Sequence, residues 1–264
     1  MPILKKRTPI ALTIAGSDSG GGAGIQADLK TFAALEVHGT SVITCLTAQN
    51  PRRVMAVSAV SAHMIRGQLE AVFAELPPDA IKTGMLYSET IIRAVAVFLR
   101  SLRRRPKLIV DPVLVATSGA RLLKQSAILT FSSELLPMAD LITPNLPEAE
   151  ALTGLTIREP EDMRTAARKL HRQYRCGVVV KGGHLPGTTT AIDIFFDGRN
   201  ERMLTIPFVR GAKLHGTGCT FSAAVTAWCA RGYGLVDAVR AAKDFVTEAI
   251  HKRMRAGRHE VLRS

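Results

Sequence analysis

The chain is poor in cysteine and in aromatic residues, and its cysteines follow no metal-binding or disulfide pattern. Its 264 residues include four cysteines, three tyrosines and one tryptophan. Cys45, Cys176, Cys219 and Cys229 lie far apart and include no Cys-x-x-Cys pair. This spacing argues against both a zinc site and a disulfide framework. We therefore expect reduced thiols.

The N-terminal region lacks a long hydrophobic run. The basic residues 1–7 are followed by a short apolar run at 10–15, which leads directly into a glycine-rich loop. A signal peptide needs a longer apolar segment before a cleavage site, and a membrane-spanning helix needs about 20 apolar residues. We expect a cytoplasmic protein with no membrane partner.

Positive charge exceeds negative charge, with 35 Lys and Arg against 22 Asp and Glu and a formal net charge of +13. Basic clusters at 100–105 and 251–263 raise the possibility of nucleic-acid binding. These clusters fall in the tail of one amphipathic helix and in the expected C-terminal helix, and few Tyr and Trp residues exist to stack on bases. We interpret the charge as a solvated surface that also attracts anionic small molecules, and we expect no nucleic-acid partner.

Short apolar runs alternate with amphipathic helical patterns along nearly the whole chain, which predicts an α/β fold. Strands are expected at residues 10–15, 41–46, 80–83, 108–110, 141–143 and 178–181, and helices at 25–35, 62–75, 89–102, 125–135, 148–153 and 161–174. Residues 191–196 and 202–206 flank an Asp-Gly turn and predict a β-hairpin, which two long helices at 219–231 and 236–253 follow. Because 47% of the residues are apolar and the composition has no break, we expect a single domain over residues 1–264.

Polar or glycine-rich residues follow each of the first six expected strands. They lie at residues 16–24, 47–50, 84–86, 111–113, 144–148 and 181–184. Because ligands bind at the carboxyl ends of parallel strands, this pattern predicts a binding site. The first loop has neither the G-x-G-x-x-G spacing nor a following Gly-Lys-Ser/Thr, so it is not a dinucleotide fingerprint or a Walker loop. It suits a small polar ligand packed against bare backbone.

The run His215-Gly216-Thr217-Gly218-Cys219-Thr220 opens an expected apolar helix. Backbone N–H groups at a helix start point at a bound anion, the helix dipole favours negative charge, and glycines let a phosphate approach the main chain. A thiol in this first turn is expected to be more acidic than a free thiol. Two interpretations of the motif alone stay open: an anion site with an active thiol, or an ordinary loop-to-helix joint with a buried cysteine.

Several side chains at the strand ends have the chemistry of ligand contacts. Gln49 can both donate and accept hydrogen bonds, which reading the edge of a heteroaromatic ring requires, and Met85 can pack on a flat ring. Asp111 and Glu148 suit Mg²⁺ held through water. Lys181 offers a point charge for a nucleotide phosphate. With the turn of residues 216–219 these groups supply a metal, a cation, a backbone cradle and a candidate base for phosphoryl transfer.

Other polar residues in these loops have structural interpretations. Asp18 is either a cap or a ligand contact, and Asp28 is expected to be an ordinary helix residue. His184 and His215 are expected to be structural histidines. The serines of the same loops do not form a Gly-x-Ser-x-Gly elbow, so hydrolase chemistry is not indicated.

The ordered motifs resemble the hydroxymethylpyrimidine/phosphomethylpyrimidine kinases of thiamine biosynthesis, which belong to the ribokinase-like superfamily. They are AGSDSGGGAGIQAD at 15–28, SVIT at 41–44, TAQN at 47–50, KTGML at 82–86, VDPV at 110–113, TPNLPEA at 143–149, VKGGH at 180–184 and HGTGCT at 215–220. The resemblance runs in order from about residue 10 to residue 250. It implies a ribokinase-like three-layer sandwich, with a central, mostly parallel sheet, helices on both faces and a small β-hairpin edge.

The resemblance also implies an activity and a set of roles. The implied enzyme uses ATP and Mg²⁺ to phosphorylate 4-amino-5-hydroxymethyl-2-methylpyrimidine and then its monophosphate, and family members are commonly homodimers. Gln49 would bind the pyrimidine, and the residues around it would be Gly16, Ala23, Asp28, Thr47, Met85, Val113 and Cys219. Asp111 and Glu148 would serve the metal, and Asn145, Lys181 and Gly218 the nucleotide. Cys219 would take the place of the catalytic aspartate of sugar kinases and, as a thiolate, remove the substrate proton, while the N–H groups of residues 216–219 stabilise the phosphoryl group.

Two departures from the family pattern bear on the second phosphorylation. Thr117 stands where the family often has a lysine, and Lys213-Leu214 stands where it often has Asn-Thr. Arg52 and Arg53 are candidates for replacement charge. Three alternatives stay open: a pyridoxal kinase of the same superfamily, a sugar or nucleoside kinase, and a ligand sensor or nucleic-acid binding protein without catalytic activity.

Overall fold

A nine-stranded sheet runs through the described part of the chain. The computed structural model describes residues 7–114, 123, 126–183, 185, 189–209 and 214–263. The strand order is β3-β2-β1-β4-β5-β6-β7-β8-β9. The strands are β1 Ile10–Asp18, β2 His38–Asn50, β3 Arg53–Ala59, β4 Ala80–Thr83, β5 Lys107–Val110, β6 Leu141–Ile142, β7 Gly177–Gly182, β8 Thr190–Phe196 and β9 Glu201–Pro207.

The middle of the sheet is parallel and both of its edges are antiparallel. β2, β1, β4, β5, β6 and β7 pair in parallel. β3 pairs antiparallel with β2 at one edge, and β8 and β9 form an antiparallel hairpin at the other. The expected mostly parallel sheet with a hairpin edge is confirmed.

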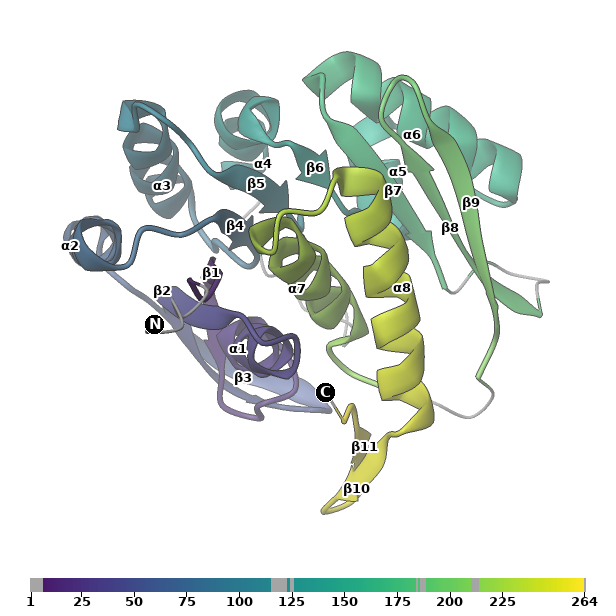
Figure 1. Ribbon diagram of the computed structural model, residues 1–264, viewed down its shortest axis with the longest axis horizontal. Helices are drawn as coiled ribbons and strands as arrows, with labels where there is room; N and C mark the ends of the chain where they lie inside the picture. The colour runs from purple at the N-terminus through teal and green to yellow at the C-terminus, as the bar shows by residue number, and fades with distance from the viewer. Residues whose placement is uncertain are drawn as a thin grey trace, which may run out of the picture.

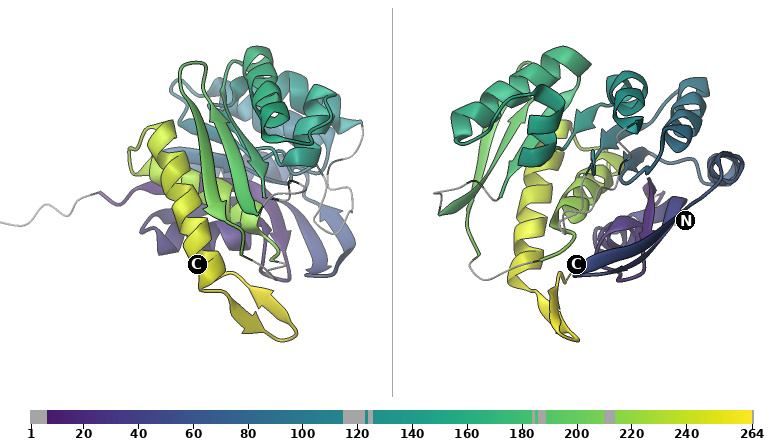
Figure 2. Two further views of the ribbon diagram at one scale, coloured as in Figure 1. Left: turned by 90° about the vertical axis from the view of Figure 1, so that its right-hand side faces the viewer. Right: turned by 180° about the vertical axis from the view of Figure 1, so that it is seen from behind.

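Helices cover both faces of the sheet (Figure 1). They are α1 Gly24–Ala34, α2 Ala62–Glu75, α3 Glu89–Ser101, α4 Ala127–Thr130, α5 Leu146–Thr153, α6 Pro160–Tyr174, α7 Thr217–Ala230 and α8 Leu235–His251. α1, α7 and α8 pack on one face and α2 to α6 on the other, with a separate apolar core beneath each group (Figure 2). The result is the three-layer sandwich that the resemblance implied.

The two-residue period of the strands supplies both cores and also one polar row. Along β1, Leu12 and Ile14 face the α2–α6 core, whereas Ala11 faces the α7–α8 core. Thr13, which lies between Leu12 and Ile14, is buried and faces α1, where it donates a hydrogen bond to Asp28. Lys82 of β4 lies beside Thr13 of β1 in the parallel pairing, and its side chain points to the same face of the sheet. The face that carries α1 and α7 therefore holds buried polar groups.

Some expected boundaries were wrong. Residues 16–18 and 47–50 were expected in loops, but β1 continues to Asp18 and β2 to Asn50. β3 was not expected. The β2–β3 ribbon leaves large apolar side chains such as Leu46 and Met55 more than half exposed, so the residues of β3 do not alternate between buried apolar and exposed polar side chains. The expected helix at 125–135 is a short α-helix continued by a π-helical turn, Phe131–Leu135.

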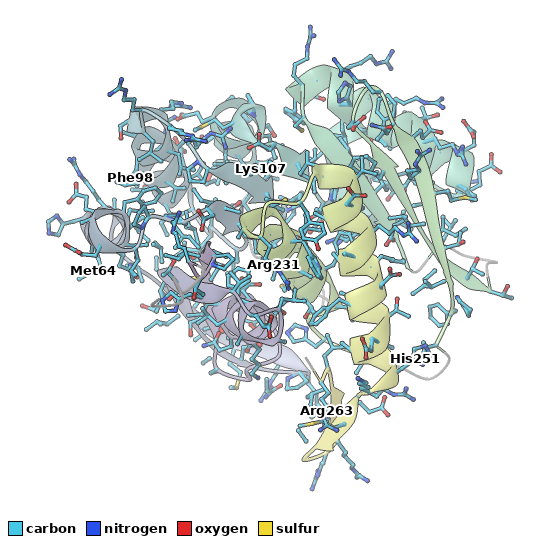
Figure 3. The ribbon with its side chains drawn as sticks, viewed as in Figure 1. Met64, Phe98, Lys107, Arg231, His251 and Arg263 are labelled. Atoms are coloured by element: carbon cyan, nitrogen blue, oxygen red, sulfur yellow. The ribbon has the colours of Figure 1, made fainter. Side chains whose placement is uncertain are left out.

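The basic C-terminal segment was placed in a helix, and this was also wrong. α8 ends at His251, and the chain then forms a two-stranded hairpin of β10, Met254–Ala256, and β11, His259–Val261. Gly257 takes the left-handed conformation at its turn, with a φ of 58°. Figure 3 shows His251 at the end of α8 and Arg263 beside this hairpin.

α7 runs antiparallel to the parallel strands, so its first turn lies at their carboxyl ends. Ser222, in the second turn of α7, donates to Asp111, which directly follows β5. At the opposite end, Lys107 begins β5 and donates to the carbonyl of Tyr233 just after α7, and Arg231 donates to the carbonyl of Leu35 (Figure 3). Both ends of α7 are thereby fixed over the sheet.

Candidate functional site

Three charged side chains, those of Asp111, Glu148 and Lys181, lie close together beneath the first turn of α7. The carboxylate of Asp111 accepts hydrogen bonds from Thr143 at 3.1 Å, from the Lys181 ammonium at 3.0 Å and from Ser222 at 3.0 Å. Asp111 is 3% exposed. Burial acts to lower the pKa of Lys181, but Asp111 and Glu148 outweigh it and hold that pKa above its usual value. Lys181 is therefore a fixed positive charge at neutral pH.

The first turn of α7 brings bare backbone next to this positive charge. Gly216 caps the helix in the left-handed conformation, with a φ of 87°. A Cβ atom at Gly218 would lie 3.1 Å from the Lys181 ammonium. The first N–H groups of a helix have no intrahelical acceptor. The turn and Lys181 together bring N–H donors and an ammonium group to one place, which suits a phosphoryl group.

Glycines let the glycine-rich loop after β1 approach the same turn. A Cβ atom at Gly216 would lie 1.7 Å from the Gly22 carbonyl oxygen, and one at Gly24 would lie 2.3 Å from the Gly16 carbonyl oxygen. Gly24 opens α1 and donates its N–H toward the Cys219 thiol. The starts of α1 and α7 therefore converge on one point.

The thiol of Cys219 is less acidic than expected from its helix position. Burial raises its pKa to about 11, and Asp111 and Asp28 act in the same direction, whereas Lys82 and the Gly24 N–H oppose them. The prediction of an acidified thiol was therefore wrong. The helix start does not compensate for low solvation beside two carboxylates.

Asp28 is not at the surface of the site. Its carboxylate is fully buried, lies 2.6 Å from the Lys82 ammonium and accepts a hydrogen bond from Thr13. The expected place of Asp28 among the residues around the substrate stays a prediction; in the structure its side chain contacts Lys82 and Thr13. Asp28 holds Lys82, whose pKa it raises above the usual value despite burial. The pair places a buried charge close to Cys219.

Gln49 lies at the far end of β2 and is held on both sides. Its amide nitrogen is 3.0 Å from Nε2 of His215, and its carbonyl oxygen is 3.3 Å from the Thr47 hydroxyl. Its own backbone N–H and carbonyl are both bonded to the Ser19 hydroxyl. Gln49 is thus fixed to the loop after β1 and to the residue before Gly216.

Asp18 organises that loop. Its carboxylate accepts hydrogen bonds from the N–H groups of Gly20, Gly22 and Ala23 and lies 3.7 Å from Nε2 of His215. Burial acts to raise the pKa of Asp18, but His215 and these N–H groups outweigh it, so the pKa lies below its usual value. Asp18 therefore holds the loop in shape and does not cap α1, whose N-cap Ala23 has no side-chain cap hydrogen bond. Nothing in the sequence indicated the pairing of Asp18 with His215.

An apolar cluster lies beside Gly16. Buried Cys45 and Met85 pack with Val113, Tyr87 and nearby valines. A Cβ atom at Gly16 would lie 2.8 Å from the Cys45 sulfur and 3.4 Å from the Met85 sulfur, so a larger residue here would have to displace the Cys45 side chain. Val113 has a φ of 40°, which is strained for a β-branched residue. Such strain is typical of functional sites.

Asp111 and Glu148 are the predicted metal ligands, and their surroundings fit Mg²⁺. Among the described residues, no group of three or more His, Cys, Asp or Glu side chains is arranged to hold a metal ion. Mg²⁺, however, is usually held by one or two carboxylates together with water and substrate phosphates. Burial and the neighbouring Asp111 raise the pKa of Glu148 despite the opposing charge of Lys181. A dication would relieve this repulsion.

Asn145 and Glu148 also form the start of α5. The Asn145 side chain accepts from the Glu148 N–H at 2.9 Å, and the Glu148 carboxylate accepts from the N–H groups of Asn145 and Leu114. This capping box fixes the Glu148 side chain toward the Asp111 segment. Contact with Mg²⁺ through water, as the sequence predicted, leaves these bonds intact.

Several expectations fall outside this site. His184, Thr117 and Lys213 lie outside the described residues. Arg52 and Arg53 are exposed at the β2–β3 turn.

A surface hollow of about 440 Å³ is lined by residues of α6 and the end of β8, none of which belongs to the strand-end loops. None of the described helices is long and apolar enough to cross a membrane.

Comparison with known proteins identifies the family. Residues 18–262 match the phosphomethylpyrimidine kinase family model. The chain is 50% identical over 244 residues to a hydroxymethylpyrimidine/phosphomethylpyrimidine kinase of Rhizobium meliloti, covering 92% of this chain and 91% of that protein. It is 46% identical over 260 residues to a thiamine biosynthesis bifunctional protein of Geobacter sulfurreducens, covering 97% of this chain but only 53% of that protein.

Solved structures agree with this assignment. A pyridoxal kinase of Bacillus subtilis, solved as an ADP complex, superposes with a TM-score of 0.90 at 36% identity over 97% of each chain. A phosphomethylpyrimidine kinase of Clostridium difficile superposes with a TM-score of 0.82 at 42% identity, covering 92% of this chain and 100% of that one. The fold and site define a ribokinase-like small-molecule kinase. The chain belongs to the phosphomethylpyrimidine kinase family.

Proposed function

We propose that this protein transfers a phosphoryl group from ATP to 4-amino-5-hydroxymethyl-2-methylpyrimidine and then to its monophosphate, giving the diphosphate used for thiamine. The observation that carries the proposal is the first turn of α7, where bare backbone, the Lys181 ammonium and the carboxylate of Asp111 meet beside the Cys219 thiol. Relatives that are 44–50% identical over most of their length and are named for these two kinase activities support it.

The pyrimidine would lie between Gln49 and the apolar cluster. The Gln49 carboxamide is held at its edge by His215 and Thr47, Met85 and Val113 offer apolar surface, and Gly16 and Ala23 leave the backbone open. A flat amino-heterocycle needs this combination of one polar edge and an apolar surface. The 5-hydroxymethyl group would then point to Cys219.

Lys181, Gly218 and Asn145 would bind the phosphates of ATP at the other end of the site. Mg²⁺ held by Asp111 and Glu148 would neutralise charge that develops on the phosphates. Lys181 and the N–H groups of residues 216–219 would stabilise the transferring phosphoryl group from the protein side. These residues supply position and charge and need form no covalent bond to the substrate.

We assign the role of general base to Cys219, although its thiol is protonated at neutral pH. Lys82 and the Gly24 N–H favour the thiolate, and the carboxylates of Asp111 and Asp28 disfavour it. Mg²⁺ held by Asp111 would offset one of these opposing charges and so favour the thiolate. Lys82 and the Gly24 N–H are the groups of the protein that already act in that direction.

A product assay with the pyrimidine alcohol and MgATP tests the substrate and both steps, because mass spectrometry separates mono- from diphosphate. We expect both products, with Cys219→Ala lowering turnover about 100-fold or more, the range for loss of a general base. Buried Cys229, at the far end of α7, provides the control, since Cys229→Ala leaves the site intact. Near-wild-type turnover by Cys219→Ala excludes the thiol as base, and absence of any pyrimidine phosphate excludes the function.

A pyridoxal kinase is the second candidate, because pyridoxal kinases superpose closely on this chain. The pyrimidine is favoured, since the chain is 44–50% identical to relatives named for it but 34–36% identical to the pyridoxal kinases. Sugar and nucleoside kinases are disfavoured by cysteine at position 219. A preference for pyridoxal in the same assay overturns the assignment.

We further propose that residues 1–264 act as one kinase domain, as a homodimer, in the cytoplasm. The continuous sheet supports one domain. The resemblance supports a dimer, and the exposed Leu46 and Met55 of the β2–β3 ribbon offer apolar surface for one. Sedimentation equilibrium of the purified protein tests the dimer, and a monomer at micromolar concentration contradicts it.

A further inference from the structure

His215 occupies a place that the proposed reaction does not explain. Its ring is one residue before the α7 cap, its side chain is 21% exposed, and its Nε2 lies 3.0 Å from the Gln49 amide nitrogen. Gln49 and His215 are 166 residues apart in the chain, and this bond joins the far end of β2 to the phosphoryl-binding turn. The two ends of the site are therefore linked through one side-chain pair.

The Gln49 carboxamide has a defined orientation in the structure: its nitrogen faces His215 and its oxygen faces Thr47. The amide nitrogen of Gln49 faces Nε2 of His215, and because an amide nitrogen can only donate, this arrangement pairs it with the His215 tautomer that has its proton on Nδ1. At the other end, the carbonyl oxygen of Gln49 lies 3.3 Å from the Thr47 hydroxyl, whose single proton it shares with the Ser17 carbonyl at 2.9 Å. Rotating the carboxamide by 180° would put its carbonyl oxygen against Nε2, which could bond it only with the ring proton on Nε2. The orientation of the Gln49 amide and the tautomer of His215 are therefore linked.

The ring itself is held by its surroundings. A Cβ atom at Gly22 would lie 3.3 Å from Cδ2 of His215, so the loop after β1 packs against the ring. Asp18 fixes that loop through three backbone N–H groups, and its own carboxylate lies 3.7 Å from Nε2, beyond hydrogen-bond distance. Gln49 is therefore the hydrogen-bond partner of Nε2, and Asp18 acts on His215 both through the loop and through the electrostatic interaction of its carboxylate with the ring.

We infer that His215 is a positioning residue that determines substrate specificity: by holding the Gln49 carboxamide in one orientation, it selects a heterocycle that pairs a ring-nitrogen acceptor with an adjacent exocyclic amine. The free amide hydrogen of Gln49 then donates to the ring nitrogen, and its carbonyl oxygen accepts from the amine. A ring with the opposite order of donor and acceptor meets two mismatched pairs. The inference rests on the proposed pyrimidine kinase function and names the residue that sets its selectivity.

Steady-state kinetics of two substitutions test it. His215→Phe keeps a flat ring but removes the acceptor, and His215→Gln restores an acceptor oxygen at about the reach of Nε2. We expect His215→Phe to raise KM for the pyrimidine alcohol about tenfold, the cost of one lost orienting hydrogen bond, with kcat and KM for ATP within about twofold of wild type. We expect His215→Gln to recover most of the loss. Discrimination against pyridoxal should fall in His215→Phe and return in His215→Gln.

His171 provides a matched control, because its ring bonds the Cys176 carbonyl far from the site, and His171→Phe should leave all these constants unchanged. An unchanged KM for the pyrimidine in His215→Phe overturns the inference, and so does an equal rise of KM for ATP or a fall in kcat, which would indicate a general structural role. Wild-type turnover separately tests the proposed function. Absence of turnover refutes both, whereas normal wild-type turnover with an unchanged variant refutes only the role of His215.

Discussion

Cys219 lies between charges of opposite sign, and their balance sets its reactivity. Burial together with Asp111 and Asp28 raises its pKa to about 11, and Lys82 acts against them. Thiol reactivity follows the thiolate fraction. With a pKa of about 11, roughly one thiol in a thousand is ionised at pH 8. A low thiolate fraction is expected to slow both alkylation and oxidation of this thiol.

Replacing either member of the buried Lys82–Asp28 pair is predicted to shift the pKa of Cys219, and the two replacements should shift it in opposite directions. Lys82→Met should raise the pKa of Cys219 above about 11 and slow its alkylation by iodoacetamide at pH 9, because a favourable positive charge is lost. Asp28→Asn should lower that pKa and speed alkylation. Peptide mass spectrometry over a pH series measures Cys219 separately from the buried cysteines.

Both substitutions leave one member of a buried pair without its partner, so each is also expected to cost about 3–5 kcal/mol of stability. Alkylation must therefore be measured under conditions in which circular dichroism shows each variant folded. Shifts of the same sign in the two folded variants would contradict the electrostatic account of the thiol.

At the scale of elements, the site depends on close approach of two backbone segments. The loop after β1 contacts the start of α7 through Gly22 and Gly216, and the loop in turn is held by Asp18. A helix start binds phosphate through its backbone, so its position relative to Lys181 must be accurate to within an ångström or so. Glycine at 216 permits both the left-handed cap and the contact.

Gly216→Ala should therefore reduce kcat/KM for MgATP about 100-fold or more, because a Cβ atom only 1.7 Å from the Gly22 oxygen must displace the turn. Gly232→Ala is the matched control, since Gly232 has a φ of 93° but no atom within 4 Å of the added Cβ. That variant should lose about 1–2 kcal/mol of stability and keep its activity. Equal kinetic losses in the two variants would attribute the effect to backbone strain alone.

At the scale of the whole molecule, one sheet carries two apolar cores. Within the described residues, the core under α2 to α6 and the core under α1, α7 and α8 are separate clusters on opposite faces of the shared strands. Because the central strands contribute alternate residues to each core, loss of one core exposes the buried face of strands that form the other. Both cores are therefore expected to unfold together.

Unfolding in urea tests this coupling with two probes. Trp228, the single tryptophan, lies in α7 and reports the α7–α8 side by fluorescence, whereas far-ultraviolet circular dichroism reports all helices. Leu69→Ala in α2 and Phe32→Ala in α1 remove fully buried side chains from opposite cores and should cost about 2–5 and 3–5 kcal/mol. Each should shift both probes to the same lower midpoint. A variant that separates the two transitions would show independent units.

Local pattern was sufficient for much of the fold. The expected bounds of α2 and β4 coincide with the observed ones, and α6 and β7 differ by a residue at one or both ends. These segments combine a clear period with a defined end, such as Ser61, whose side chain caps α2. The expected α8 extended two residues too far, because an exposed hairpin follows the helix. β3 was missed, because it belongs to an exposed ribbon.

The sequence by itself determined the alternation of strands and helices, the order of the strand-end loops and the family. It also placed Asp111, Glu148, Lys181 and the turn at 216–219 at one edge, because parallel strands that alternate with helices present their carboxyl ends together. Only the tertiary structure decided that Asp28 is buried against Lys82, that His215 holds Gln49, and that Cys219 is a weak acid. Each of these depends on desolvation and on contacts between distant segments, which no local pattern encodes.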